Sequence, residues 1–119
     1  MSKEEALRRI EKAKETGATE LDLSEMNIDE LPPELFQLTS LKELNLSGNE
    51  LNQLPAEITQ LTNLTKLDLR RNQLHELPAE ISHLTNLTRL YLGNNKLTEL
   101  PVEITQLKNL TELYLSGNQ

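Results

Sequence analysis

The sequence predicts an α/β fold: a right-handed solenoid of short parallel strands, with a helix covering its first turn. Three observations support this prediction. There are 27 leucines among 119 residues, about twice their usual frequency. Equivalent leucines recur every 23 residues, which indicates an internal repeat. The first 17 residues lie outside the repeat and have a helical pattern instead.

The N-terminal segment, residues 1–17, is predicted to be an amphipathic capping helix. Its apolar residues recur with helical spacing at Ala6, Leu7, Ile10 and Ala13. Gly17 stands where a helix commonly ends. Because the first turn of a solenoid otherwise exposes its core, we expect Leu7 and Ile10 to pack against that turn.

The repeat region comprises residues 18–119. Its unit reads L-x-x-L-x-L-x-x-N-x-L-x-x-L-P-x-E-I-x-x-L-x-N, as in Leu64–Asn86. The copies are residues 18–40, 41–63, 64–86 and 87–109, followed by a partial copy at 110–119. With nothing in the sequence to cover the last leucines, we expect the chain to be a fragment of a longer array, with a natural short protein or a consensus design as the alternatives.

Each part of the unit predicts a local structure. The x-x-L-x-L segment alternates apolar and polar residues, which is typical of a short strand with one buried face. A 23-residue spacing leaves room for a return crossover, so successive strands should be parallel. The repeated asparagine should bond backbone groups where the chain turns. The segment after Leu-Pro should form a helical or 3₁₀ turn on the convex side.

This pattern resembles the leucine-rich repeat family over residues 18–119. The resemblance implies a non-catalytic protein-binding scaffold that uses its concave sheet. The L-P-x-E-I form is similar to intracellular repeats found beside Ras-like GTPases. The stretch Thr16-Gly17-Ala18-Thr19-Glu20-Leu21-Asp22-Leu23-Ser24 resembles the opening of cyanobacterial Roco-type proteins, in which repeats precede a GTPase.

Composition excludes several functional classes. The net charge of −7 argues against nucleic-acid binding, because phosphate contacts require clustered lysine and arginine. No apolar run approaches the roughly 18 residues of a membrane span, and the N-terminus lacks a signal-peptide pattern. The absence of cysteine fits a reducing compartment, so we expect a cytoplasmic protein.

No catalytic, cofactor or metal site is predicted. His75 and His83 occupy variable surface positions, and the glutamates that recur with the repeat belong to the convex face. Gly48, Gly93 and Gly117 are expected in turns that need permissive backbone angles, not in a phosphate loop. The chain is therefore predicted not to be an enzyme.

The candidate site is the outward face of the strands. Its central and C-terminal part carries basic and aromatic residues, the types enriched at binding hot spots. The predicted partner-binding residues are Lys66, Asp68, Arg70, Arg71, Arg89, Tyr91, Glu112 and Tyr114. The basic members predict an acidic protein partner. The alternative interpretation is a solvated polar face with no partner.

Two further hypotheses concern the whole protein. The repeats could be the regulatory part of a Roco-type GTPase or of a ubiquitin ligase effector, or they could be an engineered scaffold. The open C-terminal strand also predicts a tail-to-tail homodimer through residues 107–119.

Overall fold

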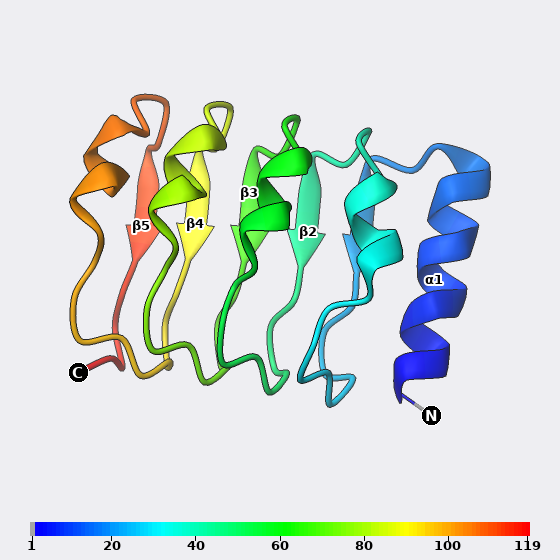
Figure 1. Cartoon of the computed structure of the whole chain (residues 1–119), viewed down its shortest axis with the longest axis horizontal. Helices are drawn as coiled ribbons and strands as arrows, with labels where there is room; N and C mark the ends of the chain where they lie inside the picture. The colour runs from blue at the N-terminus through cyan, green and yellow to red at the C-terminus, as the bar shows by residue number, and fades with distance from the viewer. Residues whose placement is uncertain (1) are drawn as a thin grey trace.

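The predicted solenoid is confirmed by a computed structural model, which describes residues 2–119 and the side chains of residues 3–119. Five parallel strands form one sheet in sequence order. They are β1 (Glu20–Asp22), β2 (Glu43–Asn45), β3 (Lys66–Asp68), β4 (Arg89–Tyr91) and β5 (Glu112–Tyr114). Figure 1 shows helix α1 (Ser2–Thr16) at one end of the sheet and β5 at the other.

A 3₁₀ helix follows each of the first four strands, as the Leu-Pro segments predict. These helices are η1 (Pro33–Gln37), η2 (Ala56–Gln60), η3 (Ala79–His83) and η4 (Val102–Gln106). Each begins just after an extended proline at the N-cap, with ψ between 137° and 150°. In the first three, a buried residue such as Ile58 or Ile81 anchors the helix to the core.

The 23-residue repeat sets the register of the sheet. Leu44 pairs with Leu67, which in turn pairs with Leu90. All three leucines are at most 1% exposed. The buried column that they form is the core of the solenoid, because each 23-residue turn, here called a coil, covers the leucines of its neighbour.

The repeated asparagines bridge successive coils. Asn72 donates from Nδ2 to the carbonyls of Leu46, at 2.9 Å, and Leu69, at 3.1 Å. Its Oδ1 accepts the backbone N–H of Leu51 at 3.0 Å. Each asparagine thus serves its own coil and the preceding one. Met26 stands at this position in the first coil, which has no preceding coil to bond.

Helix α1 ends as predicted, but a different line of residues packs inward. Gly17 has φ +63°, and the amide of Ala18 bonds the carbonyl of Ala13 at 3.0 Å, a Schellman C-cap. Ala6 and Ile10 are at most 2% exposed, whereas Leu7 is 37% exposed. The prediction for Leu7 is wrong because adjacent helix positions point about 100° apart, and the small Ala6 faces the coil instead.

The turn after each strand also differs from expectation in one coil. The left-handed backbone position falls one residue later than Gly93, on Asn94 with φ +58°. Gly93 itself has no positive φ, so its predicted conformational role is wrong. The same register position is left-handed in all five coils: Glu25, Gly48, Arg71, Asn94 and Gly117.

A candidate protein-binding face

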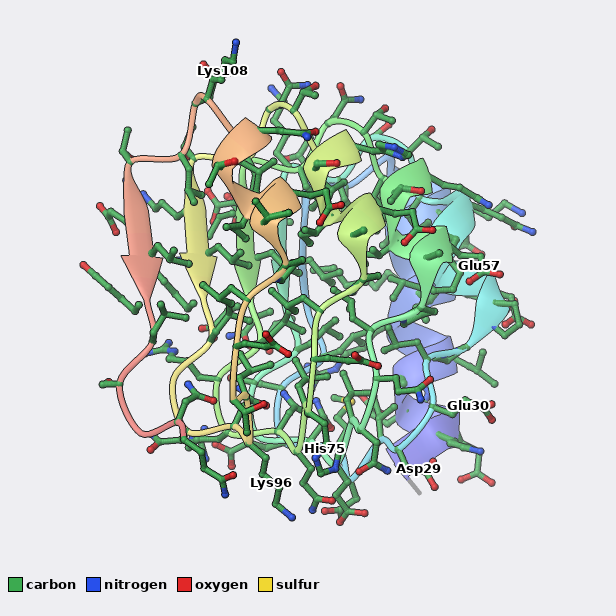
Figure 2. All side chains as sticks on the ribbon, turned by 60° about the vertical axis from the view of Figure 1, so that its left-hand side comes forward. Asp29, Glu30, Glu57, His75, Lys96 and Lys108 are labelled. Atoms are coloured by element: carbon green, nitrogen blue, oxygen red, sulfur yellow. The ribbon has the colours of Figure 1, made fainter. Side chains whose placement is uncertain are left out.

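The strands bring most of the predicted site residues together on one surface. Lys66, Arg89 and Glu112 are register partners on β3, β4 and β5. The next outward position on the same strands holds Asp68, Tyr91 and Tyr114. In Figure 2 the 3₁₀ helices lie to one side of β4 and β5, and no helix of the described chain lies on the other.

Two stacked tyrosines are the centre of this surface. The rings of Tyr91 and Tyr114 are 4.9 Å apart and inclined by only 7°. Lys66 and Arg70 place their charged groups 5.6 and 5.2 Å from the centre of the Tyr91 ring, which is cation–π geometry. Tyr114 is 52% exposed. We call Lys66, Arg70, Tyr91 and Tyr114 the aromatic–cation cluster.

The hydroxyl of Tyr91 fixes the orientation of its ring. It donates to Oε1 of Glu112 at 2.9 Å. This hydrogen bond to the carboxylate raises the pKa of Tyr91, because the protonated phenol is the form that donates. Glu112 also approaches Nε of Arg89 through its other oxygen, at 3.8 Å. The predicted residue Glu112 therefore holds Tyr91 in place and lies close to Arg89.

Asp68 positions Arg70 and is not itself open to a partner. Asp68 is only 3% exposed. Oδ1 accepts the backbone N–H of Arg70 at 3.1 Å and its Nε at 2.9 Å, while Oδ2 accepts Nη2 at 2.6 Å. The hydrogen bond to Asp68 raises the pKa of Arg70. This bidentate pair directs the guanidinium towards the Tyr91 ring.

The bond from Asp68 to the amide two residues later is part of a turn motif that sequence reasoning missed. Asp22 accepts the amide of Ser24 at 2.8 Å, and Asn45 accepts that of Ser47 at 2.9 Å. Hydrogen bonds from Ser24 lower the pKa of Asp22, and Arg9 adds to the effect. The sequence does indicate this motif, because the register position holds Asp or Asn in the first three coils. Tyrosine replaces it in the last two coils.

Arg71 is the one predicted residue that lies apart from the aromatic–cation cluster. Its Nη2 donates to Oε2 of Glu25 at 3.0 Å, so its charge is directed towards the first coil. Gly48 lies between the two side chains: a Cβ added there would come within 2.7 Å of Cγ of Glu25.

The described residues hold no group of histidine and acidic side chains arranged to bind a metal ion. His75 is exposed and lies at the lower edge in Figure 2, near Lys96. Within residues 2–119, no helix has the length and apolar character needed to cross a membrane.

Comparisons with known proteins agree with the repeat pattern. Similar solved structures include three that share at least 31% identity with the chain. A Leptospira interrogans LRR protein has 41% identity and a TM-score of 0.71, covering 92% of this chain and 34% of that one. The BIR2 ectodomain from Arabidopsis thaliana has 31% identity and a TM-score of 0.74, covering 83% and 54%. An internalin from Listeria monocytogenes has 32% identity and a TM-score of 0.65, covering 72% and 25%.

The chain therefore spans between a quarter and about half of the length of these structures. No curated protein sequence matches it. A profile for the leucine rich repeat matches residues 16–74 and 62–119, which together cover the strands and all four 3₁₀ helices. The chain belongs to the leucine-rich repeat family.

Proposed function

We propose that the chain is a non-catalytic recognition module that binds a protein partner on its concave sheet face. The observation that carries this proposal is the aromatic–cation cluster. Stacked tyrosines with adjacent cations offer a large, rigid contact surface, and tyrosine and arginine are enriched among residues that dominate binding energy. Membership of the leucine-rich repeat family supports protein binding in general.

The proposal is tested by capturing the partner with matched variants. Arg89→Glu combined with Tyr114→Ala alters the concave face and leaves Asp68 and Arg70 in place. Arg70→Glu is avoided because it would set a second carboxylate beside buried Asp68. The control, Glu57→Lys with Glu80→Lys, changes exposed residues of η2 and η3. Figure 2 shows Glu57 on the side of the 3₁₀ helices.

The expected result is loss of the partner by the concave variant alone, with both variants melting as the parent does. Equal loss by the control, or full binding by the concave variant, would move the site away from the sheet.

We also propose that the open edge of β5 supports a tail-to-tail homodimer. Leu115 is 37% exposed, whereas its equivalent Leu92 is fully buried beneath the following coil. β5 pairs only with β4 among the described strands, which leaves one edge of backbone groups free to pair with a second copy. A two-fold arrangement would bury Leu115 and Tyr114 in both chains.

From the sequence, we also propose that the repeats are the regulatory part of a larger protein, either a Roco-type GTPase or a ubiquitin ligase effector. We propose a cytoplasmic location on the same basis. The full-length gene tests the parentage: a downstream G-x-x-x-x-G-K-[ST] motif would support the GTPase, and a catalytic cysteine the ligase. An engineered scaffold would have neither.

A further inference from the structure

The charge of the concave face changes sign between β2 and β3. The first outward position of each strand is acidic in β1 and β2, where it holds Glu20 and Glu43, and basic in β3 and β4, where it holds Lys66 and Arg89. Glu43 and Lys66 are direct register partners, yet they form no ion pair. Lys66 instead extends towards the ring of Tyr91. Over β1 to β4 the face is therefore polarised along the axis of the solenoid, and Glu112 makes the same position acidic again on β5.

The acidic half has charges that are free to meet a partner. Among residues 3–119, no ion pair or hydrogen bond engages the carboxylates of Glu20 and Glu43. A hollow of about 340 Å³ lies over β1, β2 and β3. Its charged lining consists of Glu20, Asp22, Glu43, Lys66 and Asp68. Asp68 is already paired with Arg70, but Glu20 and Glu43 have no ionic partner in the described chain, so the hollow favours a cationic group beside these two glutamates.

The basic half has fewer free charges than the sequence suggests. Arg70 is neutralised by Asp68, and Arg71 is paired with Glu25. Lys66 forms no ion pair within the described chain. Arg89 approaches Glu112 only at 3.8 Å, with both side chains at least 37% exposed, so this contact is weak. Lys66 and Arg89 are thus the cations that an acidic group of a partner would meet.

We infer that the partner presents an extended segment that crosses the strands, with basic residues over Glu20 and Glu43 and acidic residues over Lys66 and Arg89. This inference rests on the proposed function of the concave face. Neighbouring strands lie about 4.8 Å apart, so the centres of the two charged pairs are separated by two strand spacings, or about 10 Å. An extended chain in the polyproline II conformation rises about 3.1 Å per residue with three residues per turn, so side chains three positions apart lie on the same face. The basic and acidic residues of the partner are therefore about three positions apart.

Synthetic peptides test this spacing directly. The polarised peptide carries two lysines and two aspartates separated by one neutral residue, and it is made in both chain directions. The control peptide has the same composition with lysine and aspartate alternating, so its net charge is equal but it has no polarity. Each is titrated into the ¹⁵N-labelled chain at low salt, and the amide shifts of β1 to β4 give the affinity.

One direction of the polarised peptide should bind about fivefold or more tightly than the control, since several exposed ion pairs add only modestly. Glu20→Gln with Glu43→Gln should abolish this preference, and Glu57→Gln with Glu80→Gln should preserve it. Equal affinities, an absence of binding, or a preference that survives in the first variant would overturn the inference. If the peptides fail but a natural partner still requires the concave face, the proposed function stands and only the inference about the charged segment is wrong.

Discussion

Arg71 reaches Glu25 across an entire coil of the solenoid, with Nη2 and Oε2 3.0 Å apart although the residues are 46 positions apart in sequence. Gly48, at the same register in the intervening coil, has φ +70°. A Cβ on Gly48 would meet Cγ of Glu25 at 2.7 Å and Nη2 of Arg71 at 3.2 Å. The absence of a side chain at Gly48 leaves room for the ion pair to link the first and third coils.

Gly48→Ala should therefore cost more than the same change at Gly17. Both positions have positive φ, where alanine is strained by about 1–2 kcal/mol, but nothing lies within 4 Å of a Cβ at Gly17. Urea unfolding should give a lower midpoint for Gly48→Ala than for Gly17→Ala. This extra loss of stability should disappear when Glu25 is also changed to alanine. Identical losses from the two single changes would show that the ion pair needs no such space.

Asn72→Ala should lower the free energy of unfolding by about 1–3 kcal/mol, because buried backbone groups lose their partners. Asn118 makes equivalent bonds to Leu92, Leu97 and Leu115 but is only half-buried, so water can replace them. Asn118→Ala should cost less for that reason. Equal urea midpoints for the two variants would contradict the role of burial.

Ile10→Ala should destabilise the chain by about 2–5 kcal/mol, because Ile10 is only 2% exposed on the inner face of α1. Leu7→Ala, on the exposed side of the same helix, is the control and should change the melting temperature little. Deleting residues 1–16 should cause aggregation or a lower melting temperature. A comparable loss from Leu7→Ala and Ile10→Ala would mean that the helix packs differently.

Acid should weaken the turn that Asp22 closes. Hydrogen bonds from Ser24 lower the folded pKa of Asp22 below its ordinary value of 3.8. The stabilisation is therefore complete above pH 3.8 and is lost as the pH falls through the lower folded value. Asp22→Asn keeps an acceptor, as Asn45 does at the same register, and should reduce the pH dependence of the urea midpoint below pH 4. An unchanged acid profile would exclude this contribution.

The proposed tail-to-tail dimer should depend on concentration. Light scattering should show association at high protein concentration that Leu115→Lys abolishes, because the lysine places charge on the paired surface. Val102→Lys is the control, since Val102 is 76% exposed on η4. A monomer that persists up to about millimolar protein would refute the dimer.

The sequence predicts the coils well because the leucines and asparagines repeat where their backbone environment repeats. The sequence predicts poorly which side chain of a helix or turn faces inward and which neighbour it contacts. Periodicity alone places Ala6 and Leu7 equally on the inner side of α1, and only packing selects Ala6. The stacking of Tyr91 on Tyr114 follows from their shared register. The ion pair between Arg70 and Asp68 does not follow from register, because it depends on how the chain turns after β3.

The asparagine ladder gives the solenoid a direction. Asn49 bonds the amides of Met26 and Ile28, so the first coil is completed only when the second has formed. The same dependence passes from each coil to the next, ending at Asn118. During synthesis each coil would thus be completed only as the next one emerges, so the described coils would form in chain order.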